Sequence, residues 1–258
     1  MTSVDTAFAK EKPLLVGYLP AGFPDKDTAI TAAQAMAKAG CGIIEIGLPY
    51  SDPLMDGPVI ADAVHRALVN GTHVRDVLDT VEAVAATGTP TLVMTYWNPV
   101  VQYGIDGFAK DLAKAGGAGL ITPDLSPEEA GPWLAASDRN DLDRVFLVAP
   151  STTDARIEMI TRHCRGFVYA ASLMGITGTR AAVSEHAQAL VARTRAHTGL
   201  PVAVGLGVSN RDQAAEVAAY ADGVIVGSAF VRSLAGGGVA AVGDLAGDLR
   251  AGIQRKTR

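Results

Sequence analysis

A glutamate interrupts the apolar, β-branched run that begins at Ile43 and ends at Gly47. Because side chains alternate across a strand, Ile44 and Ile46 face one way while Glu45 faces the other. A charged, unpaired carboxylate in apolar surroundings is costly, so either it finds a partner or its pKa rises. Perturbed carboxylates concentrate at functional sites, which favours a proton-transfer role for Glu45 over a structural ion pair with a lysine or arginine.

Two further carboxylates, Asp52 and Asp56, lie in the Pro/Gly-rich loop that follows this run. Both also fit ordinary turns, because Ser-Asp-Pro and Asp-Gly are common turn sequences. The position of Asp56, a short loop beyond Glu45, favours a shared site at which protons move. The three carboxylates leave Mg²⁺ open as a ligand, but no part of the pattern requires it, and we predict no metal.

Glycines gather at the ends of two later apolar runs. Gly205 and Gly207 follow one run, and Gly227 comes before Ser228 at the end of the other. Glycine lets backbone N–H groups approach a ligand closely, and a helix beginning at Gly227 would aim its N-terminus at an anion. Either pair alone also fits a tight turn, but both together predict a phosphate site, to which Gly178 could add a third contact.

These residues need a scaffold, and short β-branched runs alternate with longer Ala-rich segments along the whole chain. That alternation is typical of repeated βα units. Strands are predicted at residues 14–19, 42–46, 91–95, 119–122, 144–148, 166–170, 202–205 and 223–226. Helices are predicted at residues 27–39, 62–70, 74–86, 105–115, 127–136, 154–162, 184–197, 211–219 and 239–254.

Eight strands, each followed by a helix, predict a (β/α)8 TIM barrel. We expect it to form a single domain over residues 1–258, with an N-terminal helix and extra short helices. An open, doubly wound sheet is the alternative, but the dinucleotide fingerprint expected after its first strand is absent. In a barrel the functional residues lie at the carboxyl ends of the strands, where Glu45, Asp56 and both glycine pairs fall. The glycine-punctuated loop 172–180 could be a hinged lid or a plain connection.

Charge and composition argue against several classes of protein. A net charge of −5 argues against nucleic-acid binding, because the basic residues are scattered and their one cluster, residues 255–258, fits a solvated chain end. The first residues do not resemble a secretion signal, and no apolar run approaches the length of a membrane span. Cys41 and Cys164 have neither metal nor redox spacing, and the five histidines form no ligand pattern. We therefore expect buried, reduced cysteines and a cytoplasmic location.

The sequence resembles the tryptophan synthase alpha subunit family over essentially the whole chain. Residues 45–58 look like the family signature, and segments 175–178, 205–209 and 227–229 match in order and spacing. The resemblance implies retro-aldol cleavage of indole-3-glycerol phosphate to indole and glyceraldehyde 3-phosphate. Indole would pass to a beta subunit for tryptophan synthesis, in an alpha2beta2 tetramer. The resemblance implies no cofactor in this chain, with pyridoxal phosphate only in the beta partner.

The resemblance also assigns roles residue by residue. It implies that Glu45 is the catalytic glutamate and that Asp56 is the aspartate facing the indole nitrogen. The substrate-binding residues that it implies are Tyr18, Tyr96, Tyr169, Thr177, Gly178, Gly207, Gly227 and Ser228. It places the contact with the beta subunit at Asp52, Pro53 and Asn98.

The chain departs from the family pattern at three positions. Phe23 stands where the family often has aspartate, Ser126 where it usually has proline, and Leu173 where it often has arginine. These departures bear on lid closure and partner coupling rather than on the two carboxylates.

Three other functions stay open. The chain could be a free-standing indole-producing lyase, or another phosphate-binding barrel such as a phosphoribosyl-anthranilate isomerase. It could also be a non-catalytic barrel that binds a phosphorylated metabolite and regulates a partner. Glu45 and Asp56 argue against the last function, because a pure binder gains nothing from a buried carboxylate.

The run 96–103 is aromatic and apolar where a solvent-facing loop should be polar. Tyr96 fits the wall of an indole pocket. Trp97, Pro99 and Val100 are predicted to stay exposed, and an exposed apolar cluster beside an active site indicates an interface.

Overall fold

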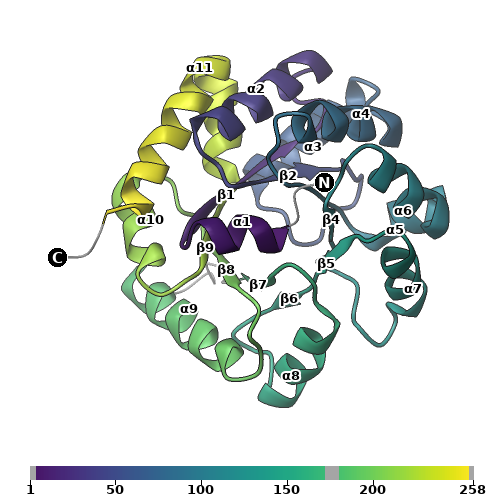
Figure 1. Ribbon diagram of the computed structural model, residues 1–258. Coiled ribbons are helices and arrows are strands. Elements are labelled where there is room, and N and C mark those ends of the chain that lie inside the picture. The colour runs from purple at the N-terminus through teal and green to yellow at the C-terminus, as the bar shows by residue number, and fades with distance from the viewer. Residues whose placement is uncertain (1–3, 172–179, 256–258) are drawn as a thin grey trace.

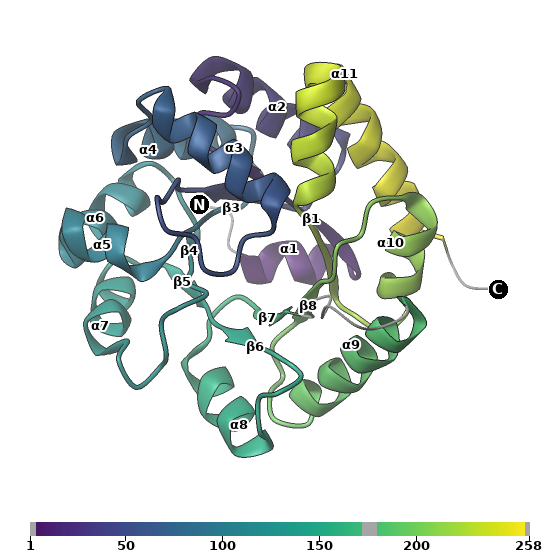
Figure 2. The ribbon, with the colours of Figure 1, turned by 180° about the vertical axis from the view of Figure 1, so that it is seen from behind.

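The computed structural model describes residues 4–171 and 180–255. Within them one parallel sheet curls around an axis and helices surround it (Figures 1 and 2). The strands, in chain order, are β1 (Leu14–Pro20), β2 (Ile43–Gly47), β3 (Thr91–Met94), β4 (Gly119–Ile121), β5 (Asp143–Val145), β6 (Leu147–Val148), β7 (Val168–Ala171), β8 (Val202–Gly205) and β9 (Gly223–Val226).

The sheet closes through the segment that carries β5 and β6. Hydrogen-bonded neighbours follow the order β5-β4-β3-β2-β1-β9-β8-β7-β6, so β5 and β6 occupy the two ends of that order. Only Phe146 separates them along the chain, and they pair with β4 and β7 respectively. They are therefore two halves of one barrel strand. The predicted eight-stranded barrel is confirmed, with the predicted strand 144–148 divided where it changes neighbours.

Nine helices cover the described part of the barrel wall. They are α2 (Lys26–Ala39), α3 (Pro58–Val69), α4 (Val74–Ala85), α6 (Ile105–Lys114), α7 (Gly131–Arg139), α8 (Asp154–His163), α9 (Arg180–Arg195), α10 (Arg211–Ala218) and α11 (Ser228–Ile253). Two short helices, α1 (Val4–Lys10) and α5 (Trp97–Tyr103), lie outside the βα repeat. The sequence missed α5, and it began α3 at residue 62 and α7 at residue 127, four residues from their observed starts.

Caps fix the ends of the best-predicted helices. The Asp25 carboxylate accepts the backbone N–H of Thr28 at 2.9 Å and begins α2, which ends at Gly40 with a φ of 108°. Only glycine adopts that left-handed conformation without strain. Asn210 begins α10 in the same way, accepting the N–H of Gln213 at 3.0 Å. Both helices were predicted to within one residue because these signals are local.

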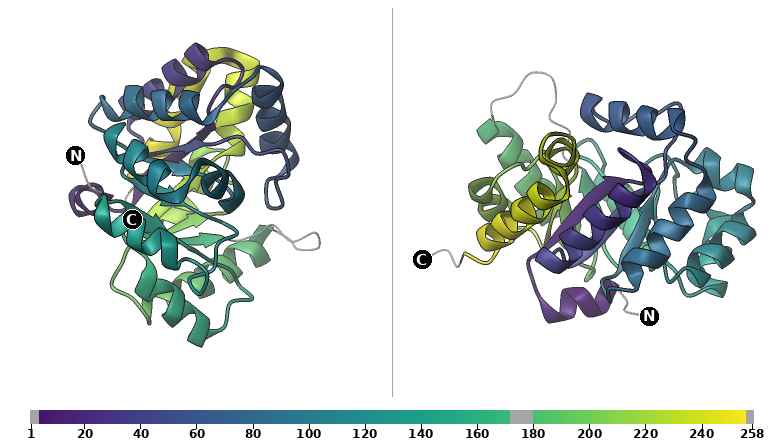
Figure 3. Two further views of the ribbon diagram at one scale, coloured as in Figure 1. Left: turned by 90° about the vertical axis from the view of Figure 1, so that its right-hand side faces the viewer. Right: turned by 90° about the horizontal axis from the view of Figure 1, so that it is seen from above.

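Helix α1 closes the amino-terminal end of the barrel, and Figure 1 shows it lying across the barrel axis. Val4 and Phe8 are buried in the cluster of side chains that fills the barrel interior. The ring centroids of Phe8 and Phe167 lie 5.8 Å apart, and the ring planes are inclined at 57°. The side view in Figure 3 places α1 at the end of the barrel opposite the loops that follow the strands. The open end of the barrel interior is therefore the one that carries the loops after the strands.

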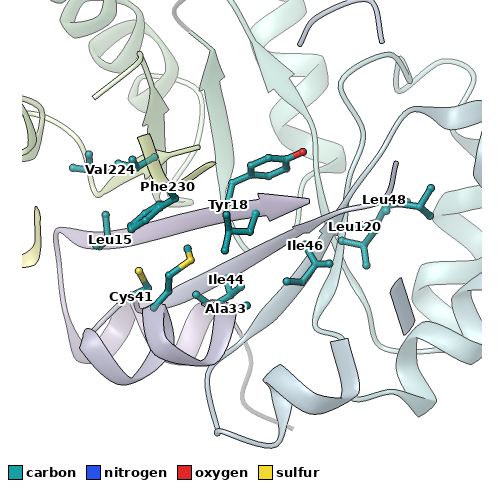
Figure 4. Close-up of a cluster of buried hydrophobic side chains, with 14 of the residues drawn as sticks. Leu15, Tyr18, Ala33, Cys41, Ile44, Ile46, Leu48, Leu120, Val224 and Phe230 are labelled. Atoms are coloured by element: carbon teal, nitrogen blue, oxygen red, sulfur yellow. The ribbon is translucent and has the colours of Figure 1, made fainter. Parts of the chain in front are cut away.

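A second apolar layer packs between the barrel and its helices. Figure 4 shows Ala33, Cys41 and Ile44 between the first strands and α2, while the ring of Tyr18 points to the other side of the sheet. Cys41 and Cys164 are both free and buried, as predicted. Burial raises the pKa of the Cys164 thiol to about 12 and that of Cys41 further still. Both cysteines therefore remain protonated core residues.

Within the described residues, α11 alone is long and apolar enough to cross a membrane, judged by length and composition only. The sequence analysis had found no such run. Gly238, with φ 67° and ψ −162°, breaks the helix into two, and Phe230 and Leu249 are fully buried against the barrel. Figure 1 shows α11 beside α2 and α10 in the outer ring. This arrangement is typical of a covering helix.

The prediction of an exposed apolar cluster at residues 97–100 is wrong in its membership. Val100 is fully buried, while Trp97 and Pro99 are half-buried. These residues form α5, which turns one side inward, where Trp97 packs edge-on against a tryptophan of α7. Val101 and Tyr103, 45% and 39% exposed, are the apolar side chains that reach the surface instead.

Candidate active site

A cavity of about 140 Å³ lies at the carboxyl ends of the strands. Seven residues predicted from the sequence line it: Tyr18, Glu45, Asp56, Tyr169, Gly207, Gly227 and Ser228. Gly205, from the glycine pair predicted to bind phosphate, also lines it, and four further lining residues were not predicted to touch a ligand: Ile60, Met94, Leu206 and Ile225. Several of these are apolar residues at or near strand ends, and only their place in the closed barrel distinguishes them from ordinary core.

Glu45 is the middle residue of β2 and has no exposed surface. Neither of its carboxylate oxygens has a hydrogen-bond partner among the described residues. Desolvation raises the pKa of Glu45 to about 8, because the charged form has lost water and gained no compensating donor. At neutral pH the side chain therefore holds a proton that it can give to a ligand in the cavity.

Asp56 reaches the same cavity from the loop between β2 and α3. It lies two residues before Pro58, which begins α3, and is half-buried. Burial raises the pKa of Asp56, and a hydrogen bond with the Tyr96 side chain partly offsets this effect. The Tyr96 hydroxyl also accepts the N–H of Met55 at 2.8 Å. Tyr96 does not line the cavity, so its place in the site is to hold the loop that carries Asp56.

Two tyrosine side chains pack against glycines on neighbouring strands. A Cβ atom on Gly47 would lie 2.3 Å from the hydroxyl oxygen of Tyr18, and one on Gly205 would lie 2.5 Å from that of Tyr169. Any larger residue at either position would displace a ring. The sequence assigned Gly205 to phosphate binding and gave Gly47 no role. The structure shows that each glycine makes room for a tyrosine that lines the cavity with Glu45.

The glycines at the ends of β8 and β9 form the third side of the cavity. Gly207 has a φ of 72°, a left-handed conformation that favours glycine. Gly227 precedes α11, and no side chain caps the N–H groups of the first helical turn, which begins at Ser228 in the cavity wall. Such a helix start suits an anion. Thr177 and Gly178, also predicted to bind substrate, lie outside the described residues.

Comparison with known proteins identifies the family. The family model described as "Tryptophan synthase alpha chain" matches residues 4–244. The chain is 58% identical to the tryptophan synthase alpha chain of Acidothermus cellulolyticus, over 99% of this chain and 98% of that one. It is 56% identical to that of Mycobacterium avium, over 95% and 91%. The chain belongs to the tryptophan synthase alpha chain family.

Solved structures agree with this membership. The aminoacrylate-bound form of tryptophan synthase from M. tuberculosis matches with a TM-score of 0.91 and 50% identity, over 98% of this chain and 100% of that chain. The alpha subunit from Legionella pneumophila matches with a TM-score of 0.90 at 33% identity, over 98% of each chain. Alpha chains of this family cleave indole-3-glycerol phosphate and pass indole to a beta partner. The chain is therefore a lyase of tryptophan biosynthesis.

The residues expected to meet the beta subunit lie on the rim above the cavity. Asp52 and Asn98 are exposed and Pro53 is half-buried. Beside them Leu54 is 84% exposed and Met55 is 41% exposed. We call residues 52–55 and 98–103 the rim surface. Met55 is hydrogen-bonded to Tyr96, the residue that precedes α5, and this bond ties the loop carrying Asp56 to that helix.

Two of the three departures from the alpha chain family lie in the described residues. Phe23 is buried, with the guanidinium of Arg66 in α3 4.9 Å from its ring centroid. A cation–π contact therefore ties the loop after β1 to α3 where the family often has a carboxylate. Ser126 begins the turn before α7, its carbonyl accepting the N–H of Glu129 at 3.0 Å. Leu173 lies outside the described residues.

No group of three or more His, Cys, Asp or Glu side chains in residues 4–171 and 180–255 is placed to hold a metal ion. Glu45 and Asp56 share a cavity without a third carboxylate. The cavity is thus built from two acids, two tyrosines, apolar walls and a helix start, which suits proton transfer on a phosphorylated aromatic ligand.

Proposed function

We propose that the cavity is the place where indole-3-glycerol phosphate is cleaved, with Glu45 as general acid and then general base. The burial of Glu45 without any described partner carries this proposal, since a carboxyl group held this way is a proton donor near neutral pH. A carboxylate with a structural role would instead be paired, as Asp76 is with Lys26 at 2.9 Å.

The two acids have different roles: Glu45 would transfer protons, and Asp56 would stabilise charge. Glu45 gives its proton to ring carbon C3, which leaves a cationic indolenine. The resulting Glu45 carboxylate accepts the proton of the side-chain hydroxyl next to C3 as the C–C bond breaks. The bonding electrons return to the ring and yield indole, while the former hydroxyl carbon becomes the aldehyde of glyceraldehyde 3-phosphate. Asp56, ionised, binds the ring N–H and stabilises the positive charge that develops there.

The phosphate would lie against the backbone N–H groups of Gly207 and Gly227 and the hydroxyl of Ser228. The start of α11 supports this placement, because its N–H groups are uncapped. We propose Thr177 and Gly178 as additional substrate contacts on the resemblance alone. Tyr169 and Tyr18 would flank the bound ligand from opposite sides of Glu45.

We further propose that this chain acts as a single domain without a cofactor of its own and functions in the cytoplasm. It would assemble with a beta subunit as an alpha2beta2 tetramer, with Asp52, Pro53 and Asn98 in the contact. The M. tuberculosis relatives, whose titles name the whole tryptophan synthase, support a beta partner. Pyridoxal phosphate would reside in that partner only.

One assay tests the core of the proposal. Indole release from indole-3-glycerol phosphate is measured for the chain alone and with a beta subunit, and again for Glu45→Gln. We expect cleavage that the beta subunit accelerates, and a loss of about 10²–10⁴-fold or more in Glu45→Gln, because glutamine keeps the volume but cannot cycle a proton.

Other outcomes would favour the alternatives. Full-rate indole release without any partner would indicate a free-standing lyase. Substrate binding without any cleavage by the wild-type chain would indicate a regulatory barrel. Most of the wild-type rate in Glu45→Gln would disprove the role of that residue.

A further inference from the structure

Tyr18 lies next to Glu45 on the inner wall of the barrel. The register of the two strands pairs Tyr18 of β1 with Glu45 of β2. Both line the same cavity, and Figure 4 shows the Tyr18 ring on the side of the sheet away from α2. In a parallel pair, residues in register project on the same face. The tyrosine is thus the immediate cross-strand neighbour of the proton donor.

Glycines on either side of Tyr18 locate the two ends of its side chain. A Cβ atom on Gly227 would lie 3.6 Å from the Tyr18 Cβ and 3.3 Å from a ring carbon. A Cβ atom on Gly47 would lie 2.3 Å from the hydroxyl oxygen. The side chain therefore runs from the start of α11, at the phosphate end, to β2, at the acid end.

The hydroxyl end comes close to the reacting groups. Gly47 and Glu45 face the same way on β2, about 6.6 Å apart along the strand. Burial together with the nearby carboxyl groups of Asp56 and Glu45 raises the pKa of Tyr18 well above its ordinary value. The hydroxyl therefore stays protonated at neutral pH and can donate a hydrogen bond.

The substrate carries its only free hydroxyl groups on the three-carbon chain between phosphate and ring. If the phosphate lies at the start of α11 and the ring lies at Glu45 and Asp56, that chain must pass along the Tyr18 side chain. The apolar lining residues Ile60, Met94 and Ile225 offer it no hydrogen bond. A polar partner for the chain must come from the few polar groups of the wall.

We propose that Tyr18 is a specificity residue whose hydroxyl binds a hydroxyl group on the three-carbon chain of the substrate. This role rests on the function proposed above and extends it. Tyr18 would distinguish a hydroxylated chain from a plain alkyl chain, and Gly47 would keep the space in which the tyrosine hydroxyl lies. The glycine is then a positioning residue that acts through Tyr18.

The test compares two ligands in a background that cannot turn over substrate. Dissociation constants of indole-3-glycerol phosphate and of indole-3-propanol phosphate, which lacks both chain hydroxyls, are measured by calorimetry on Glu45→Gln and on Glu45→Gln/Tyr18→Phe. For the hydroxylated ligand we expect the Kd to rise about 2- to 12-fold when the tyrosine hydroxyl is removed. For the propanol compound the Kd should change less than about twofold.

Phenylalanine keeps the ring, and circular dichroism with thermal melting verifies that the fold is retained. The matched control is Tyr220→Phe, which removes a hydroxyl from the turn that precedes β9, at the end of the barrel opposite the cavity, and should leave both Kd values unchanged. Equal weakening of both ligands, or of neither, would overturn the role of Tyr18 while leaving the proposed cleavage intact. Failure of both ligands to bind Glu45→Gln, together with no indole from the wild type, would overturn both proposals.

Discussion

At the residue scale, the placement of Glu45 links activity to stability. A carboxyl whose pKa is about 8 in the folded chain, against an ordinary value of 4.5, binds more protons folded than unfolded between those two pH values. The sign follows from linkage: this group's contribution to stability falls as pH rises through that window. The residue that would make the site reactive therefore makes the fold weaker at neutral and alkaline pH.

We accordingly expect Glu45→Gln to flatten the dependence of stability on pH. Between about pH 5 and pH 8 the wild type should lose up to about 1.4 kcal/mol per pH unit relative to the variant. Urea unfolding of both proteins at several pH values measures the difference, and common contributions from other groups cancel. Identical slopes would mean that Glu45 is ionised in the folded protein and finds a partner there.

Asp56 carries a different prediction because its surroundings differ. It is half-buried and hydrogen-bonded with Tyr96, which favours the charged form relative to Glu45. In Asp56→Asn we expect kcat to fall about 10²–10³-fold with a smaller change in substrate Kd, because the ring charge appears only in the transition state. Steady-state kinetics with calorimetric binding separates the two effects. A change in KM alone would show that Asp56 only positions the ring.

At the element scale, the strands were predictable because their signal is local. β8 and β9 have the predicted bounds. Of the other strands, each undivided one has at least one end within one residue of its predicted position. The predicted strand 144–148 is divided into β5 and β6, where it changes neighbours. Helix α5 was not predictable in this way. Its first N–H, that of Trp97, is bound at 2.8 Å by the carboxylate of Asp124, 27 residues further along the chain. A cap supplied from another loop leaves no mark in the local sequence.

The site residues were likewise predictable where their signal is local and were missed where the contact joins distant segments. Glu45 was recognised because a carboxylate inside a β-branched run is visible in five residues of sequence. The contact between Tyr18 and Gly47 joins two strands, and that between Tyr169 and Gly205 joins two others. Such clearances depend on the register of neighbouring strands, which no local pattern states.

The turn after β8 gives a prediction for the phosphate end. Gly207→Asp adds a side chain at a φ of 72° and a negative charge beside the phosphate position, so we expect substrate Kd to rise at least tenfold. The matched control is Gly88→Asp, which has a similar φ of 84° and open space around it. Both variants should lose about 1 kcal/mol of stability from the backbone strain.

Only Gly207→Asp should bind the substrate more weakly. Calorimetric titration with indole-3-glycerol phosphate and urea unfolding of both variants separate binding from strain. Equal binding in the two variants would move the phosphate away from the turn after β8.

At the scale of the whole molecule, the two ends of the barrel have opposite characters. Helix α1 seals one end with Val4 and Phe8, whereas the other end carries the cavity and an exposed apolar rim. Leu54, at 84% exposed, would be a liability on a monomer and is suited to burial by another chain. A partner covering that rim would also enclose the route by which an apolar product leaves the cavity.

Two substitutions on the rim surface test this arrangement. Asn98→Asp adds a charge to an exposed position of α5, and Pro53→Thr alters the half-buried start of the loop that carries Leu54 and Met55. We expect each to weaken beta-subunit binding about tenfold or more, and to reduce activation by the beta subunit, because interface cores are depleted of charge and rely on close packing. Binding of the phosphate ligand to the isolated chain should be unchanged in both variants.

Val69→Thr serves as the matched control for that experiment. Val69 is 72% exposed at the far end of α3, so it changes an exposed apolar residue away from the rim. Binding of each variant to the beta subunit is measured by calorimetry, and activation by indole release. Because Met55 is hydrogen-bonded to Tyr96, and Tyr96 to Asp56, a docked partner that shifts the rim would also shift Asp56. Normal binding and activation in both rim variants would place the partner elsewhere and leave the exposed Leu54 unexplained.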